Sequence, residues 1–158
     1  MNSNDVTDSI RAPVLALDLG SKRVGVAVSD SLSISINRLA AIQRTNWKQL
    51  LRDVEKLALR LDAQTLVIGL PLKLDGSLGD AALAARQTAS KFARSLRLPV
   101  YLQDERLSSA QAEQNLREAG VRAEDIGKQL DSEAAALILR DFLASDQERL
   151  LVSPHLSD

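Results

Sequence analysis

The sequence predicts an α/β domain with a mixed five-stranded sheet and helices on both faces. Three strand-like apolar runs follow one another near the start, which favours an antiparallel meander. Segments of helical periodicity then alternate with short apolar runs, a pattern typical of right-handed crossovers between parallel strands. No internal repeat, low-complexity segment or Pro/Gly-rich linker interrupts the 158 residues. One domain over residues 14–145 is therefore expected, with a flexible tail over 1–13 and a second tail over 146–158.

Residues 14–30 (VLALDLGSKRVGVAVSD) predict the first two strands, joined as a hairpin. An apolar run ends on Asp18, a polar turn with Lys22 and Arg23 follows, and the second run alternates large and small residues. The irregular alternation of residues 34–43 indicates a third strand. A carboxylate that ends a buried strand beside a cationic turn suits divalent metal and phosphate chemistry. Burying such a charge without a partner is costly, which favours a functional role.

Helices and strands alternate through the rest of the chain. Asn46 is placed to cap a helix from Trp47 to about Leu61, whose apolar positions recur at spacings of three and four. The run 65–70 (TLVIGL), bounded by Pro71, fits a strand buried on both faces. The remaining expected elements are a helix from about Asp80 to Leu98, a strand from Pro99 to Asp104–Glu105, a helix from Ser108 to Ala119 stopped by Gly120, a mobile loop over 121–130, and a helix from near Asp131 to about Leu143.

Composition excludes several kinds of chemistry. Cysteine is absent and the single histidine, His155, lies near the end, so thiolate sites and histidine-based triads are not expected. Carboxylates must then carry any acid–base or metal-binding work. No apolar run approaches the roughly 20 residues that span a bilayer, and the polar first residues do not resemble a signal peptide. These features predict a cytoplasmic protein with no membrane partner.

The charge distribution points to a nucleic-acid partner despite a net charge of -1. Residues 21–100 hold 13 Lys and Arg against 6 Asp and Glu, whereas residues 101–158 hold 6 against 12. A basic first half can meet phosphates while an acidic second half supplies metal ligands.

Three carboxylates, Asp18, Glu105 and Asp131, are the predicted catalytic and metal-binding residues. Ligands of such sheets bind beyond the carboxyl ends of the parallel strands, where Asp18 and the Asp104–Glu105 pair fall. Three carboxylates can hold two Mg²⁺ or Mn²⁺ ions about 3.5–4 Å apart and clamp a phosphodiester for attack by water. Asp104 is the alternative to Glu105 as a metal ligand, because neighbours on a strand point to opposite faces and only one of the two can face the metals. Asp131 has the alternative role of a favourable acid at a helix start.

Six basic residues are predicted to contact nucleic acid: Lys22, Arg23, Arg86, Lys91, Arg94 and Arg106. The first two lie in the first turn, for which an ordinary hairpin turn is the alternative. The next three lie on the polar side of the helix 80–98, which contains no acid over residues 81–98, whereas a solvated face normally mixes signs. A plain exposed face is the alternative for this helix. Arg106 is placed to orient Glu105, to touch substrate, or to pair with Asp104.

Five blocks of sequence, in order, resemble the YqgF family, the Holliday-junction-resolvase-like nucleases associated with pre-16S rRNA. The blocks are LDLGSKRVGVAVSD (17–30), GLPLKLDGSLG (69–79), FARSL (92–96), PVYLQDERLSSAQAE (99–113) and DSEAAALIL (131–139). The resemblance implies a ribonuclease H-like fold and a metal-dependent nuclease that matures the 5′ end of small-subunit ribosomal RNA. It also implies that the metal-binding carboxylates are Asp18, Glu105 and Asp131. In the better-known resolvases an acid ends the fourth strand, where this chain has Gly69–Leu70–Pro71, so Glu105 must reach the metals from the next strand.

Three functions remain open from the sequence. The first is a nuclease acting on structured RNA, and the second is a resolvase of branched DNA, which would require a symmetric dimer to cut two strands in register. The third is a nucleic-acid-binding module without catalysis. The sequence does not distinguish a monomer from a homodimer. An actin-like sugar kinase is disfavoured, since 158 residues cannot supply its two domains.

Overall fold

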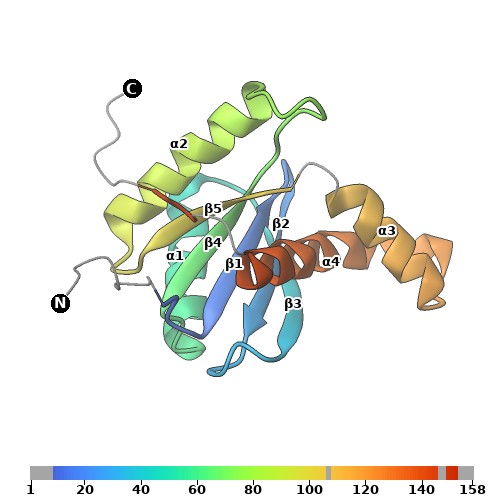
Figure 1. Cartoon of the computed structure of the whole chain (residues 1–158), viewed down its shortest axis with the longest axis horizontal. Helices are drawn as coiled ribbons and strands as arrows, with labels where there is room; N and C mark the ends of the chain where they lie inside the picture. The colour runs from blue at the N-terminus through green and yellow to red at the C-terminus, as the bar shows by residue number, and fades with distance from the viewer. Residues whose placement is uncertain (1–8, 106–107, 146–148, 153–158) are drawn as a thin grey trace.

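A six-stranded mixed sheet carries helices on both faces in the computed structural model, which describes residues 9–105, 108–145 and 149–152 (Figure 1). The strand order is β3-β2-β1-β4-β5-β6. Strands β1 to β3 form an antiparallel meander, whereas β4 and β5 run parallel to β1. The elements are β1 (Val14–Leu19), β2 (Arg23–Ser29), β3 (Ile36–Gln43), α1 (Trp47–Arg60), β4 (Thr65–Leu70), α2 (Asp80–Ser95), β5 (Val100–Asp104), α3 (Ser108–Glu118), α4 (Ala123–Ala144) and β6 (Leu150–Leu151).

The order of the first five strands and of the helices confirms the prediction, but the sheet has one strand more than the five expected. Leu150 and Leu151 form β6, which pairs antiparallel with Leu102 and Tyr101 of β5. Val152 follows it and is buried. Two residues are too few for any periodicity to be recognised, so this strand was predicted as part of the tail 146–158.

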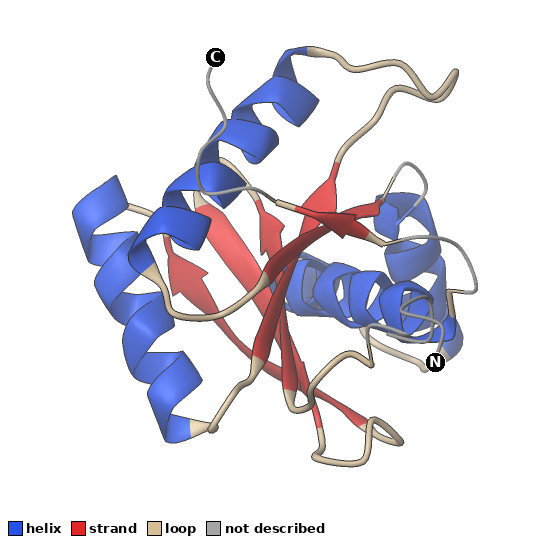
Figure 2. Ribbon diagram, turned by 60° about the vertical axis from the view of Figure 1, so that its left-hand side comes forward, coloured by secondary structure: helices blue, strands red, loops and turns tan. Residues whose placement is uncertain are grey.

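One face of the sheet is covered by α1 and α2, as Figure 2 shows from the side. Residues of β1 alternate across the sheet, and Leu15 and Leu17 point to this face. They pack with Val54 of α1 and with Phe92 of α2. The edge of the Trp47 ring meets the Phe92 ring with centroids 4.8 Å apart. This layer supplies the larger part of the apolar core.

The opposite face is covered by α4. Val14 and Ala16 of β1 and Ala27 of β2 pack there against Ile138 and Phe142 of α4. Small side chains on the strands allow this helix to lie close to the sheet, since packing depends on filling the space between the elements. Asp18 follows Ala16 by two residues and therefore belongs to the α4 face.

The helix ends follow the expected signals with one adjustment. The Asn46 side chain accepts a hydrogen bond of 2.9 Å from the Gln49 amide and caps α1. Gly120, with φ of +82°, follows the end of α3 in a conformation that favours glycine. Helix α2 ends at Ser95 instead of Leu98, because Leu96 is already extended.

The predicted mobile loop over 121–130 is wrong, because α4 begins at Ala123. Ile126 is buried and Leu130 packs on a cluster that Ala112 of α3 shares with α4. This tertiary contact stabilises a segment whose local sequence did not indicate a helix. Helix α3 packs on the first half of α4, beyond the end of the sheet (Figure 1). Asp131 consequently lies inside a 22-residue helix and not at its start.

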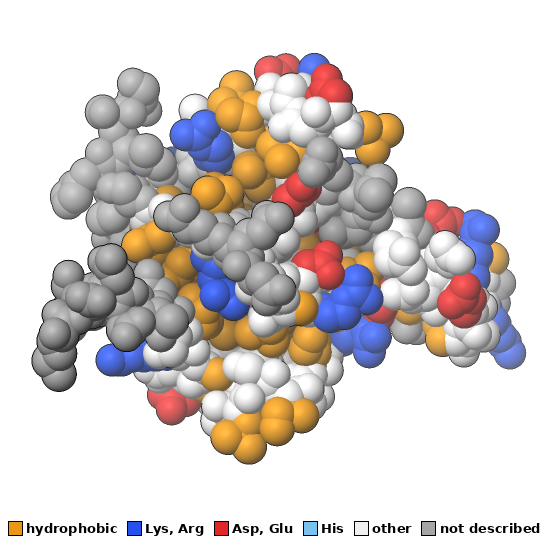
Figure 3. Space-filling model, in the orientation of Figure 1, with side chains coloured by type: hydrophobic (Ala, Val, Ile, Leu, Met, Phe, Trp, Pro, Cys, Tyr) orange, Lys and Arg blue, Asp and Glu red, His pale blue; other side chains and the backbone are white. Residues whose placement is uncertain are grey.

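The surface carries isolated apolar side chains. Leu32 and Ile34 in the β2–β3 connection are 74% and 79% exposed, and hydrophobic atoms gather at that end of the molecule (Figure 3). Within the described ranges, none of the helices combines the length and the apolar character needed to cross a bilayer.

Candidate active site

Two of the predicted carboxylates meet at the carboxyl edge of the parallel strands. Asp18 lies near the end of β1, and Glu105 directly follows β5. The two side chains share a hydrogen bond although their strands are separated by β4. Both side chains are mostly buried.

The close approach changes the acidity of both groups. Burial, together with the charge on Asp131, raises the pKa of Asp18, although its hydrogen bond with Glu105 opposes the rise. Burial, the charge on Asp18, the hydrogen bond to Asp18 and the charge on Asp104 raise the pKa of Glu105 to about 9. At neutral pH Glu105 therefore keeps its proton and donates it to the Asp18 carboxylate.

Strand alternation explains why Glu105 and not its rival Asp104 joins Asp18. Tyr101 of β5 packs in the layer beneath α4, whereas Val100 packs in the layer beneath α1 and α2. Side chains alternate between the two faces along a strand, so Glu105 points to the same face as Tyr101, and Asp104 to the same face as Val100. The charge on Asp104 contributes to the raised pKa of Glu105. Glu105 therefore meets Asp18 because both side chains lie on the face that α4 covers.

A glycine in β4 makes room for the Glu105 carboxylate. A Cβ at Gly69 would lie 2.5 Å from Glu105 Oε2 and 2.6 Å from Ile138 Cδ1. The Glu105 side chain thus occupies the space that a side chain of β4 would fill. This arrangement accounts for the absence of an acid at the end of β4.

A second glycine brings α4 against the sheet at Asp131. Gly25 of β2 is the register partner of Asp18, and a Cβ at Gly25 would overlap the backbone carbonyl of Asp131. The Asp131 side chain is 23% exposed and lies close enough to raise the pKa of Asp18. Its Oδ2 atom accepts a hydrogen bond of 2.9 Å from Arg23 Nε. Asp131 is thus close to the acidic pair but neutralised by Arg23.

The donor set fits a divalent cation, although the carboxylates are not gathered around one point. Within the described ranges, no three acidic or histidine side chains converge closely enough to hold an ion. Asp18 and Glu105 are nevertheless held together by a hydrogen bond, and burial together with the charge on Asp18 raises the pKa of Glu105. Carboxylate oxygens are the ligands preferred by Mg²⁺ and Mn²⁺. Two acids that must share a proton would gain by sharing a cation instead.

The predicted nucleic-acid-binding residues are distributed unevenly around this pair. Lys22 is exposed in the turn that follows Asp18 by a few residues, and Arg23 pairs with Asp131. Lys91 lies over the Trp47 ring, 5.5 Å from its centroid. The remaining predicted residues are Arg86, which is partly buried on α2, Arg94, which is exposed on α2, and Arg106, which lies outside the described residues.

Most of the basic residues of helix α2 lie far along its axis from the end that is near the carboxylates. It begins near the carboxyl edge and runs back toward the start of β5. Lys91 and Arg94 lie roughly 16 and 21 Å along the helix axis from Asp80, at 1.5 Å per residue. The structure therefore brings Arg23 to Asp131, but it leaves Lys91 and Arg94 far along α2.

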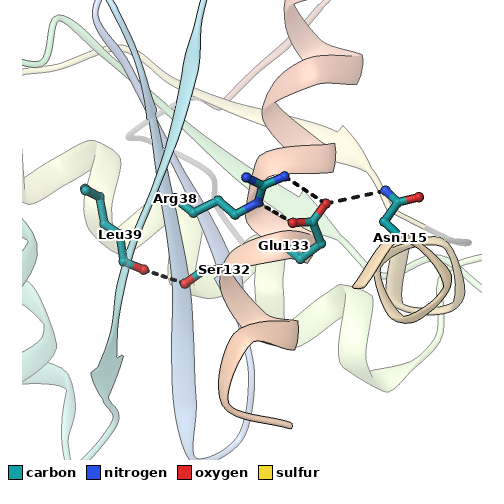
Figure 4. A network of polar contacts seen from close by, with 5 residues as sticks. All are labelled: Arg38, Leu39, Asn115, Ser132 and Glu133. Carbon is teal, nitrogen blue, oxygen red and sulfur yellow. Dashed lines mark hydrogen bonds and ion pairs between the residues drawn. The ribbon is translucent and has the colours of Figure 1, made fainter. Parts of the chain in front are cut away.

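A polar network next to the site fixes α4 to its neighbours (Figure 4). Arg38 of β3 donates through Nε and Nη2 to the buried Glu133 carboxylate, and Asn115 of α3 donates to it at 3.4 Å. Ser132 Oγ donates to the Leu39 carbonyl at 2.5 Å. The network follows Asp131 directly in sequence, so it sets the position of this turn of α4. None of these residues was among the predicted functional residues.

Arg38→Ala is expected to lower the free energy of unfolding by about 2 kcal/mol, because Glu133 would remain buried without its cation. Arg38 is 56% exposed, so water compensates for part of the loss. Urea denaturation measures the effect, and Arg52→Ala on the exposed side of α1 is the matched control. Equal midpoints for the two variants would mean that the ion pair does not stabilise the fold.

The meander, the parallel crossovers and the acidic pair at the sheet edge together define a protein of the ribonuclease H-like class. A model of the Holliday junction resolvase family RuvX matches residues 12–145. A protein from Anaeromyxobacter sp. (strain Fw109-5) named "Putative pre-16S rRNA nuclease" is 39% identical over 129 residues, which cover 82% of this chain and 94% of the relative. A protein of the same name from Gloeothece citriformis (strain PCC 7424) is 41% identical over 148 residues, covering 91% and 94%. The chain belongs to the RuvX family.

Two solved structures align over most of this chain. T. thermophilus RuvC in complex with a Holliday junction substrate aligns with 87% of this chain and 98% of its own, with a TM-score of 0.49 and 16% identity. The complex of Fowlpox virus resolvase with Holliday junction DNA aligns with 85% and 100%, with a TM-score of 0.49 and 14% identity.

Proposed function

We propose that this chain is a divalent-metal-dependent nuclease that hydrolyses phosphodiester bonds of structured RNA, acting at the 5′ end of pre-16S rRNA. The observation that carries the proposal is the buried Asp18–Glu105 pair at the carboxyl edge of the sheet, with Asp131 close by. The names of the relatives from Anaeromyxobacter and Gloeothece support the choice of substrate.

The three carboxylates have separate roles in this proposal. Mg²⁺ or Mn²⁺, when bound, supplies charge to the phosphodiester and lowers the pKa of the attacking water. Asp18, Glu105 and Asp131 would hold the cation, which would take the place of the proton that Asp18 and Glu105 share. Arg23 contacts Asp131 beside this pair, and its planar guanidinium is of a kind well suited to bind a phosphate.

Asp18→Asn is expected to reduce metal-dependent cleavage by about a thousandfold, because a neutral amide at the centre of the ligand set holds a cation poorly. The measurement is single-turnover cleavage of an RNA that spans the 5′ end of pre-16S rRNA, in Mg²⁺ and in Mn²⁺. Asp141→Asn is the matched control, since Asp141 is an exposed acid on α4 away from the pair. Full activity of the Asp18→Asn variant, purified in parallel, would contradict the proposal.

A second function, resolution of branched DNA, is favoured by the description of the RuvX family. The same assay with a four-way DNA junction and a matched duplex separates it from the first. Faster cleavage of the junction than of the RNA, by a protein that elutes as a dimer, would replace the RNA substrate with branched DNA. Tight binding without cleavage at any metal concentration would leave only a binding module.

A further inference from the structure

A groove at the carboxyl edge of the sheet, on the side of α2, has no role in the function proposed above. Its volume is about 280 Å³. Leu19, Ser21 and Arg44 line one side, and Ala81, Ala84 and Thr88 of α2 line the other. The described lining contains no acidic residue and no aromatic residue. An apolar groove with a single cation is the usual composition of a site that places one charged group of a ligand.

The groove and the acidic pair lie on opposite sides of Gly69, at the same edge of the sheet. The backbone of Gly69 borders the groove, while the Glu105 carboxylate lies against the other side of the same glycine. Asp18 and Leu19 are neighbours at the end of β1, so the two sites also meet there. A strand bound at the carboxylates can therefore continue across the edge of the sheet into the groove.

Arg44 is the charged group of this groove, and its position is fixed by the β1–β2 turn. Its amide donates to the Lys22 carbonyl at 2.9 Å, and its Nη1 donates to the Gly20 carbonyl at 2.9 Å. The side chain is partly buried. Among the described residues no carboxylate lies within ion-pairing distance of it. A partly buried guanidinium with one backbone acceptor keeps most of its five donors for another partner.

We infer that the groove binds one nucleotide of the strand that is cut, with Arg44 on its phosphate and the sugar and base against the alanines of α2. The inference rests on the proposed nuclease function and extends it from the scissile bond to a neighbouring nucleotide. Alanine side chains at positions 81 and 84 let a sugar–phosphate backbone approach the helix closely. The volume admits a single strand and not a duplex, so the site selects an unpaired segment.

The test is binding of a short fluorescein-labelled single-stranded RNA in EDTA, which removes cleavage from the measurement. Arg44→Gln is expected to weaken binding about tenfold. It should also reduce the slope of log K against log salt by about 0.7, the value for one phosphate contact on a single strand. Arg52→Gln removes an exposed cation of α1 and is expected to change neither quantity by a comparable amount.

A second variant tests the groove without removing charge. Ala84 is exposed, so Ala84→Trp is compatible with the fold while it fills the groove. Ala84→Trp is expected to weaken RNA binding about tenfold and to leave the slope of log K against log salt unchanged. Gln87→Trp on the same helix is expected to leave RNA binding unchanged. A duplex RNA probe should respond to neither substitution.

Binding by Arg44→Gln equal to that of Arg52→Gln would overturn the inference. Equal binding by Ala84→Trp and Gln87→Trp would also overturn it, even if Arg44→Gln alters the turn. Because both measurements are made without metal, their failure leaves the proposed nuclease activity standing. Conversely, unimpaired cleavage by Asp18→Asn would remove the nuclease without affecting the binding result.

Discussion

Glu105→Gln is expected to make the metal-free protein more stable and the metal-dependent enzyme nearly inactive. Glu105 and Asp18 are two mostly buried acids that share one hydrogen bond, and burial together with the charge on Asp18 raises the cost of ionising Glu105. An amide at position 105 can still donate to Asp18 but never carries a negative charge. The variant therefore loses the cost of keeping residue 105 protonated in the folded state, and it loses the proposed metal ligand as well. Opposite signs for stability and activity are typical of a strained functional site.

The stability of the metal-free wild-type protein is expected to fall as the pH rises. The pKa of Glu105 is raised from 4.5 to about 9 in the folded protein. Between these values the folded chain holds a proton that the unfolded chain has released, so unfolding is favoured as the pH rises. Metal-free wild-type protein should lose stability from about pH 5 to pH 9, by at most about 1.4 kcal/mol per pH unit for one proton. The Glu105→Gln protein should show a flatter profile over the same range.

Thermal denaturation in EDTA at several pH values measures the stability, and a Mg²⁺ titration measures its recovery. Wild-type protein should gain melting temperature with Mg²⁺ at pH 8, because the cation replaces the shared proton. Glu105→Gln should gain less. Glu55→Gln on α1 is the control for losing a carboxylate elsewhere on the chain. A wild-type profile that rises with pH, or an equal Mg²⁺ response in both proteins, would contradict the assignment of Glu105.

The fold was largely predictable because local patterns and tertiary packing agree over most of the chain. The apolar run 65–70 forms the buried strand β4, and Asn46 caps helix α1, as their local sequences indicate. The predictions fail where tertiary contacts decide the outcome. Residues 123–130 become helical because Ile126 and Leu130 pack against neighbouring helices, and β6 exists only because β5 offers an open edge.

The candidate site was predictable in its acids but not in the residues that position them. Asp18 and Glu105 end strands, and the edge where they meet follows from the crossover rule. Gly25 and Gly69 carry an available signal, since a glycine inside a strand often marks a close approach by another group. Which group approaches them depends on where α4 lies, and no local pattern specifies this. The position of the Arg44 side chain was not predictable for the same reason, because it is fixed by a turn that lies far from it in sequence.

Gly25→Ala is expected to lower the free energy of unfolding by about 3 kcal/mol and to reduce cleavage at least about a hundredfold. The added Cβ would overlap the backbone carbonyl of Asp131, so α4 itself must move. Displacing a catalytic group by about 1 Å can cost a hundredfold in rate. Gly69→Ala instead meets the ends of the Glu105 and Ile138 side chains, which can rotate. It should therefore cost less stability while still impairing cleavage.

Gly120→Ala separates a general loss of stability from displacement of α4. Gly120 has a φ of +82° and no heavy atom within 4 Å of an added Cβ, so alanine strains the backbone there without touching the site. We expect it to lose about 1 kcal/mol of stability and no activity. Urea denaturation measures the stability of the three glycine variants, and the cleavage assay measures their rates. Both are carried out well below the melting temperatures. Gly25→Ala cleaving as fast as Gly120→Ala would mean that the contact between α4 and β2 does not position Asp131 for catalysis.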